Sequence, residues 1–397
     1  MNILGIDTIN RGTSNQLKGL IIQAQQDKNN LHNKFIPINE LVWTGLNGEF
    51  FSARNFKNTQ QFNTALSNRI DVFLQKNYHV PDIIALPFDQ SLGIKENEDV
   101  DLLAELLKEN FLKHNIKIKT LVIASNLYSY KNADFIHIGA HQLSQEDEDR
   151  LQKDTALNKR IIRTLGVPSD LTKMQIKLAT HKNEQLKNLI ESYATTPTVV
   201  YSLGGKTADG IIKFTIDDAQ NIMNSAYCFA EHGYKVIITN SQRTPNDVTD
   251  YLYQQCLDNL DIVFYNCKNV AKTEAEKQNF RFYTGPHEKE FSDFYDLYGN
   301  IYPAVLDICD FVVNSHDSFS YTSDVAALGI PSVVYTGNEI GEQRFDCHKL
   351  FKLCHEAGYT ISLNEAVQTI KSGQKIKTKP LAKTSKQIID TLKKIFV

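Results

Sequence analysis

The sequence lacks the features of a secreted protein. Its first half contains no cysteine, and its six cysteines all lie in the second half. Four of them stand in apolar, helix-like runs, as reduced core residues do: Cys228, Cys256, Cys309 and Cys354. The pairs Cys347-His348 and Cys354-His355 are further apart than the ligands of zinc sites. We therefore expect a reducing compartment, no disulfide framework and no metal site.

Long apolar runs and a cleavable leader are also missing. The opening segment, MNILGIDTIN, has neither the basic start nor the apolar stretch of a signal peptide. No uninterrupted apolar run approaches the length that spans a membrane. We expect a cytoplasmic protein, and peripheral contact with the inner membrane stays open.

Neither sign of charge is in strong excess. The chain carries 43 lysines and arginines against 46 aspartates and glutamates, a formal net charge of -3. A protein that binds nucleic acid usually presents a basic surface. We therefore expect no nucleic-acid partner, and the oligomeric state is not indicated.

The length and the pattern predict an α/β protein with two domains. A chain of 397 residues is too long for one ordinary core. Short apolar strands alternate with amphipathic helices in both halves, which predicts parallel sheets covered on both faces. Segment 194–198 contains proline and suits a linker. The expected domains cover residues 1–194 and 198–380, and a C-terminal helix over 381–397 could pack back on the first domain.

The apolar runs and their spacing place the expected elements. Strands are expected at 2–6, 35–38, 82–86, 120–124, 135–138, 198–203, 235–240, 261–265, 280–284, 310–314 and 332–336. Helices are expected at 16–26, 62–74, 100–111, 169–193, 216–232, 246–258, 301–309, 319–328, 347–357 and 385–396. The helix over 169–193 would be capped by Ser169 or Asp170.

Polar residues follow three of the strands expected in the second half. The segments are Tyr201–Lys206, Thr239–Pro245 and Asn314–Asp324. In a parallel sheet, ligands bind at the carboxyl ends of strands, beside the N-termini of helices. The three segments therefore predict one shared site.

Gly204, Gly205 and Lys206 form the first of these segments. Two glycines let the backbone approach a ligand closely, or they support a turn with positive φ. Lys206 would meet a phosphate in the first interpretation. The segment matches neither a Walker loop nor GxGxxG, so both interpretations stay open.

The second segment, Ser241-Gln-Arg-Thr-Pro245, opens a helix. Thr244 can cap this helix, and Pro245 suits its first turn. Capping leaves Arg243 unexplained. A guanidinium beside a helix N-terminus suits a diphosphate, because it adds bidentate donors to the backbone N–H groups. We predict phosphate binding by Ser241, Arg243 and Thr244.

The third segment is rich in hydroxyl and carboxylate groups. Asp317 and Ser318 lie where a strand gives way to a helix, with Ser320 and Asp324 beyond them. They are either dense N-capping or a loop that holds phosphate and sugar, with Asp324 on a ribose hydroxyl pair. His316 is either a loop histidine or a general acid or base.

The first half offers a corresponding loop after its first strand. It contains Gly12, Thr13, Ser14, Asn15 and Gln16. The loop is either a turn with a cap or a contact with the acceptor of the reaction. Asp89 and the residues beside it end a later strand, and Asp89 is a second candidate base.

These segments, in this order, resemble the plant mitochondrial-fission-factor family and its bacterial relatives, which are similar to GT-B glycosyltransferases. The resemblance is carried by Gly12-Thr-Ser-Asn-Gln16, Gly204-Gly205, Ser241-Gln-Arg-Thr-Pro245, Asp317-Ser-Phe-Ser-Tyr-Thr-Ser-Asp-Val325 and Gly329-Ile-Pro331. Gln242 stands where the family has arginine, and Asp324 stands where it has glutamate.

The resemblance implies two Rossmann-like domains facing across a cleft. The second would bind a nucleotide diphosphate-sugar as a substrate, without a separate cofactor, and the first would bind a glycan or lipid acceptor. The alternative is a non-catalytic adaptor with the same fold, which recruits a protein partner. An epimerase that depends on NAD is less favoured, because no GxGxxG follows the first strand.

Overall fold

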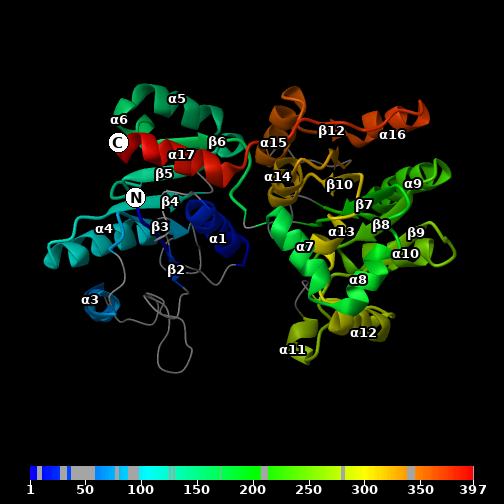
Figure 1. The fold of residues 1–397 in the computed structure, drawn as a ribbon, viewed down its shortest axis with the longest axis horizontal. Helices are drawn as coiled ribbons and strands as arrows, with labels where there is room; N and C mark the ends of the chain where they lie inside the picture. The colour runs from blue at the N-terminus through cyan, green and yellow to red at the C-terminus, as the bar shows by residue number, and fades with distance from the viewer. Residues whose placement is uncertain are drawn as a thin grey trace. The chain divides into compact units, whose positions relative to one another are not determined.

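The computed structural model describes residues 1–6, 11–26, 34–36, 59–76, 80–87, 98–124, 127, 130–169, 171–206, 213–278, 282–337 and 345–396. The chain divides into two compact units. One contains Met1–Asp170 together with Ala382–Val397, and the other contains Leu171–Leu381. Each unit is a parallel α/β sheet with helices packed against it (Figure 1).

In the described part of the first unit, a six-stranded sheet runs in the order β2-β1-β3-β4-β5-β6. Its strands are β1 (Ile3–Ile6), β2 (Lys34–Ile36), β3 (Ile83–Pro87), β4 (Lys119–Ile123), β5 (Phe135–Gly139) and β6 (Ile161–Thr164). Its helices are α1 (Arg11–Gln26), α3 (Thr59–Gln75), α4 (Glu98–Lys113), η3 (Ala140–Gln142), α5 (Gln145–Lys153), α6 (Thr155–Asn158) and α17 (Thr384–Phe396).

In the second unit, the described strands form a six-stranded sheet in the order β12-β11-β10-β7-β8-β9. They are β7 (Thr198–Ser202), β8 (Lys235–Thr239), β9 (Ile262–Tyr265), β10 (Phe311–Ser315), β11 (Ser332–Tyr335) and β12 (Ile361–Ser362). The helices are α7 (Lys173–His181), α8 (Glu184–Glu191), α9 (Ile216–Glu231), α10 (Asn246–Cys256), α11 (Glu274–Lys277), α12 (Glu288–Tyr298), α13 (Tyr302–Val305), α14 (Phe319–Leu328), α15 (Phe345–Glu356) and α16 (Leu363–Lys371).

The central strands are buried on both faces, as their continuous apolar runs require. In β7, Val199 and Tyr201 belong to one hydrophobic cluster, whereas Val200 belongs to another. Successive side chains of a strand point to opposite faces of the sheet. The two clusters therefore cover the two faces, which confirms the expected Rossmann-like architecture.

The C-terminal helix α17 packs on the first unit, as expected. Ile388, Ile389 and Leu392 share a buried cluster with Leu17 and Leu20 of α1. Figure 1 shows α17, in red, beside β6. The helix covers one face of the first sheet.

The division between the units lies earlier in the chain than the sequence indicates. Residues 171–194, assigned above to the first domain, belong to the second unit. Ile176 of α7 and Leu186 and Ile190 of α8 are buried in the same cluster as Val200 and Ile237. Burial of these apolar residues against the second sheet decides which unit the helices join.

Two expected elements differ in the structure. The helix expected at 169–193 is two helices, because the Asn183 side chain accepts a hydrogen bond from the Leu186 N–H at 3.0 Å and caps α8. Thr172, rather than Ser169, caps α7, and Asp170 lies outside the described residues. The strand expected at 280–284 falls partly outside the described residues, and Tyr283 makes only an isolated bridge to Val270.

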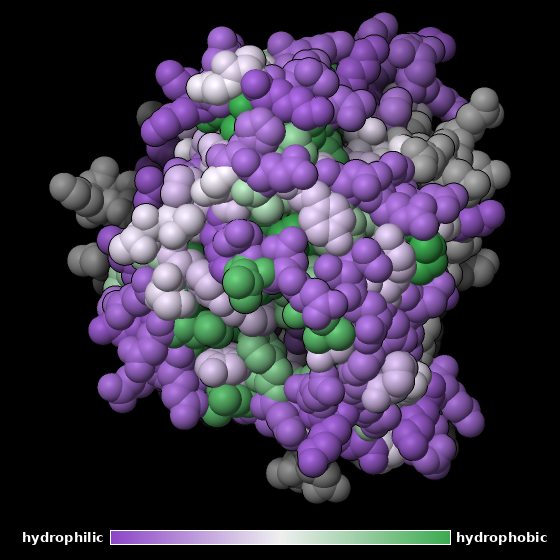
Figure 2. All heavy atoms as spheres, turned by 90° about the vertical axis from the view of Figure 1, so that its right-hand side faces the viewer, coloured by the Kyte–Doolittle hydropathy of each residue, from purple (hydrophilic) through white to green (hydrophobic). Residues whose placement is uncertain are grey.

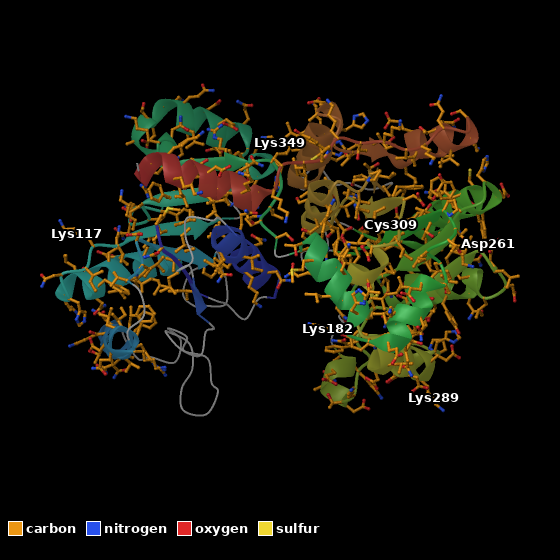
Figure 3. All side chains as sticks on the ribbon, viewed as in Figure 1. Lys117, Lys182, Asp261, Lys289, Cys309 and Lys349 are labelled. Atoms are coloured by element: carbon orange, nitrogen blue, oxygen red, sulfur yellow. The ribbon has the colours of Figure 1, made fainter. Side chains whose placement is uncertain are left out.

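Five cysteines are free thiols: Cys228, Cys256, Cys267, Cys309 and Cys354. Cys309, labelled in Figure 3, precedes β10 and is half-buried. Burial raises the pKa of the Cys309 thiol to about 12, so the group stays protonated near neutral pH.

Candidate functional site

The site is organised by the order of strands in the second sheet. Counted along the chain, β7 to β12 lie in the doubly wound order 3-2-1-4-5-6. Strands β7 and β10 are neighbours and pair in parallel. From β7 the chain adds strands toward one edge of the sheet, and from β10 it adds them toward the other edge. Ligands of such sheets bind at this switch point, outside the carboxyl ends of the strands. The three polar segments follow β7, β8 and β10, so the sheet brings them to one edge.

The first contact at this edge joins the loop after β7 to the end of β10. The Gly204 N–H donates to Ser315 Oγ at 2.7 Å, and the Gly205 N–H donates to Asp317 Oδ2 at 3.0 Å. A Cβ on Gly204 would lie 2.0 Å from Asp317 Oδ2, and one on Gly205 would lie 2.1 Å from the Arg243 carbonyl oxygen. Close packing therefore requires both glycines, whatever they do for a ligand.

The loop after β8 is hydrogen-bonded to Gly204. Ser241 Oγ donates to the Gly204 carbonyl oxygen at 3.1 Å, and Thr244 Oγ1 donates to the same atom. Thr244 Oγ1 also accepts from the Ser241 N–H at 3.0 Å. The expected cap by Thr244 is therefore wrong: Pro245 occupies the N-cap position of α10, and its side chain makes no capping hydrogen bond.

Arg243 and Asp317 form an ion pair across the edge. Arg243 Nη2 lies 2.8 Å from Asp317 Oδ2 and 3.5 Å from the Asp317 carbonyl oxygen. The Asp317 side chain is 0% exposed, whereas the Arg243 side chain is 34% exposed. Asp317 Oδ1 is buried and has no hydrogen-bond partner among the described residues. The Asp317 carboxylate thus orients the guanidinium. It also accepts a hydrogen bond from the Gly205 N–H, a donor that a bound anion could otherwise use.

Helices α10 and α14 begin at this edge without a capping side chain. Pro245 precedes α10, and Ser318, at the N-cap of α14, makes no side-chain capping bond. By contrast, Thr215 caps α9 and Ser362 caps α16 through their hydroxyl groups. The first N–H groups of a helix have no partner within it, so α10 and α14 present donors and a positive dipole end.

The remaining predicted residues of this unit lie around the same segments. Ser318 is buried and Ser320 is exposed in the first turn of α14, while Lys206 is exposed after β7. Asp324 is half-buried further along α14. The pKa of the buried Tyr302 is raised, first by the burial of its hydroxyl and then by the negative charge of Asp324.

His316 is 8% exposed and bonded to the end of β11. Its Nδ1 lies 3.2 Å from the Tyr335 carbonyl oxygen, which can only accept, so Nδ1 carries the proton. Nε2 is buried and has no hydrogen-bond partner among the described residues. Burial lowers the pKa of His316, with Asp317 acting in the opposite direction, so the ring is neutral at pH 7.

The candidates of the first unit are placed only in part. Gly12, Thr13, Ser14, Asn15 and Gln16 lie in α1, which begins at Arg11, and not in a loop before it. The side chains of Asn15 and Gln16 are half-buried. Serine and asparagine favour caps and turns, which is why this sequence suggested a loop, yet the helix includes these residues. Asp89 lies outside the described residues.

Sequence reasoning missed Lys268. It follows β9, is 0% exposed, and its Nζ donates to the Thr244 carbonyl oxygen at 2.7 Å and to Asn246 Oδ1. The signal available was the polar run Asn266-Cys267-Lys268 after an expected strand. Asn266 Oδ1 accepts from Asn240 at 2.8 Å, which ties the end of β9 to the end of β8.

A separate pocket of about 480 Å³ lies between α9 and α16. Its lining includes Asn221 and Asn224 of α9, Tyr335 at the end of β11, and Asn364 and Lys371 of α16. None of the residues predicted from the sequence lines it.

The face seen in Figure 2 is mostly hydrophilic, with hydrophobic residues in small separate patches. Among the described residues, no helix is long and apolar enough to cross a membrane.

Comparisons with known proteins agree with this architecture. A family model described as mitochondrial fission ELM1 matches residues 111–388. No curated protein sequence matches the chain. The solved structure of UDP-GlcNAc 2-epimerase from Methanocaldococcus jannaschii is 13% identical, with 99% of each chain covered and a TM-score of 0.51. That of the Neisseria meningitidis enzyme bound to UDP-GlcNAc is 12% identical, covering 99% of this chain and 100% of that one, with a TM-score of 0.51. At these identities the likeness concerns the fold.

Proposed function

The chain belongs to the mitochondrial fission ELM1 family, and from that premise we propose that it is a GT-B-type glycosyltransferase whose donor is a nucleotide diphosphate-sugar. Its acceptor would be a glycan or a lipid. The observation that carries the proposal is the pair of uncapped helix N-termini, α10 and α14, at the switch point of the second sheet. The donor diphosphate would take up their free N–H groups.

Arg243 would contribute charge to the same diphosphate. Asp317 holds its Nη2, and a third of the side chain is exposed, so the guanidinium is oriented while other donors stay accessible. In glycosyl transfer, the bond from the sugar to the diphosphate breaks as the acceptor oxygen bonds to the sugar. Negative charge then grows on the leaving diphosphate, and fixed N–H donors and an arginine stabilise it without a metal.

The acceptor hydroxyl must also lose a proton. His316 is a proposed base, because its Nδ1–H is held by the Tyr335 carbonyl and its neutral Nε2 can accept a proton. Asp89 remains the other proposed base. Residues Gly12–Gln16 remain proposed acceptor contacts.

The proposal is tested by calorimetry against UDP-, GDP- and ADP-sugars, with a CMP-sugar, which carries only one phosphate, as the comparison. A simple Arg243→Ala variant would leave the buried Asp317 without its counter-charge, so lost binding could reflect lost folding. The sharper variant is R243Q/D317N, which removes both charges together. Lys289→Gln, an exposed cation on α12 (Figure 3), is the matched control.

Micromolar binding of one donor by the parent and by Lys289→Gln, lost in folded R243Q/D317N, would support the proposal. Product analysis with the bound donor then separates transfer to an acceptor from epimerisation. That step is needed because the same fold occurs in UDP-GlcNAc 2-epimerases. The absence of GxGxxG argues only against epimerases that use NAD.

A non-catalytic adaptor is the second candidate. It is favoured by the internal use of the anion-binding groups: Asp317 already occupies Nη2 of Arg243 and the Gly205 N–H. If the folded protein binds none of the four nucleotide-sugars, the transferase proposal fails and the adaptor becomes the better account.

A further inference from the structure

Lys268 is a cation enclosed beneath the proposed anion site. The residue is 0% exposed. Its Nζ donates to the Thr244 carbonyl oxygen at 2.7 Å and to Asn246 Oδ1, and it lies 6.0 Å from the centre of the Tyr283 ring. These hydrogen bonds hold the residues on both sides of Pro245, where α10 begins.

This position is unfavourable for a cation on its own account. A helix N-terminus carries positive potential, which repels a neighbouring positive charge. No described carboxylate forms an ion pair with Lys268; Asp250, on α10, instead accepts a hydrogen bond from the Tyr283 hydroxyl at 2.5 Å. Its Nζ is held by a carbonyl oxygen and an amide oxygen rather than by a carboxylate, and keeping a buried amine charged in such surroundings is costly.

We propose that Lys268 is the positioning cation of the anion site, which holds Thr244 and Asn246 in place and adds the positive charge that a bound diphosphate neutralises. The proposal rests on the proposed function and deepens it, because it adds a residue that acts on the diphosphate through the loop 241–246. Methionine would fill the same space without the charge, and arginine would keep the charge.

The charged groups that face Lys268 come from two elements besides its own. Asp247 and Asp250 lie on α10, and Lys206 follows β7. Burial lowers the pKa of Lys268 to about 8; the two aspartates act in the opposite direction, and Lys206 adds to the lowering. A bound anion favours the protonated amine. Affinity is therefore highest below the pKa of the free protein and falls as pH rises through it.

The experiment measures the affinity for UDP between pH 7 and 9.5 in the full-length protein and in K268R, K268M and K206Q. We expect the parent to lose about tenfold in affinity over this range, since one buried charge is lost. K268R should show no such loss. K268M should bind about tenfold more weakly at pH 7 and show little pH dependence. K206Q should bind UDP more weakly. It should also move the midpoint of the affinity loss to higher pH, because the Lys206 charge is one cause of the lowered pKa of Lys268.

A second probe separates this proposal from the donor assignment. Inorganic sulfate keeps its charge over the whole range and carries no nucleoside, and its binding is followed as an increase in melting temperature. If sulfate stabilises the parent and K268R but not K268M, while neither UDP nor any of the four nucleotide-sugars binds, the role of Lys268 stands and the nucleotide-sugar donor is wrong. If UDP binds with the same pH profile in the parent and K268R, the Lys268 proposal is overturned and the donor survives. If neither sulfate, nor UDP, nor any of the four nucleotide-sugars binds, both are overturned.

Discussion

Arg243 Nη2 lies 2.8 Å from Oδ2 of Asp317, and the aspartate side chain is completely buried while the arginine is partly exposed. One ion pair therefore joins the loop after β8 to the loop after β10 across the end of β7. This pair both closes the edge of the sheet and fixes the direction of a guanidinium.

The first prediction concerns the stability of this pair. Arg243→Gln leaves a buried carboxylate without a counter-charge and should lower the free energy of unfolding by about 2 to 4 kcal/mol. R243Q/D317N should recover most of that loss, because no buried charge remains. Urea unfolding of both variants checks this, and a double variant less stable than the single one would contradict it.

The second prediction concerns Gly205. A Cβ there would lie 2.1 Å from the Arg243 carbonyl oxygen and 2.5 Å from the Thr244 nitrogen, which are backbone atoms that cannot turn aside. Gly205→Ala should cost about 3 kcal/mol or more. Gly233→Ala is the control: its φ is +84° but nothing lies within 4 Å of its Cβ, so it should cost only about 1 to 2 kcal/mol. Equal losses in thermal unfolding would show that steric contact at Gly205 is relieved cheaply.

The third prediction is a pH dependence of stability. The pKa of Lys268 is about 8 in the folded protein, below the ordinary lysine value of about 10.4 in an unfolded chain. Between these pH values the unfolded state holds the proton and the folded state does not, so the free energy of unfolding rises with pH. Over this pH interval the free energy of unfolding of the parent should rise by about 2 to 3 kcal/mol relative to that of K268R, whose guanidinium stays charged in both states. Parallel pH profiles for the two proteins would show that Lys268 does not lose its charge in this range.

The fourth prediction concerns the C-terminal helix. Leu392 is 0% exposed and packs in the cluster that contains Leu17 of α1, whereas Ile395 is 45% exposed. Leu392→Ala should destabilise the first unit by about 2 to 5 kcal/mol, and Ile395→Ala by less than about 1 kcal/mol. Hydrogen exchange of the strand amides in the first unit measures both. Similar exchange in the two variants would mean that α17 is not needed to cover this sheet.

Local sequence patterns predicted individual strands and helices correctly where the periodicity of apolar residues was strong. Buried apolar runs such as Val236–Ile238 indicated strands, and the spacing of Ile388, Ile389 and Leu392 indicated a terminal helix. They failed where a single side chain decided the outcome. Asn183 interrupts an otherwise helical stretch by capping α8, and Thr244 bonds to Gly204 across the sheet edge where its position suggested a cap.

The sequence by itself determined the alternation of strands and helices and the polar segments at the ends of three strands, because these depend on residues close together in the chain. Only the tertiary structure decided that β10 lies beside β7, that Asp317 faces Arg243, and that Lys268 is buried beneath α10. Those facts depend on the order of strands in the sheet, which joins residues 24 to 112 positions apart through contacts that no local pattern encodes.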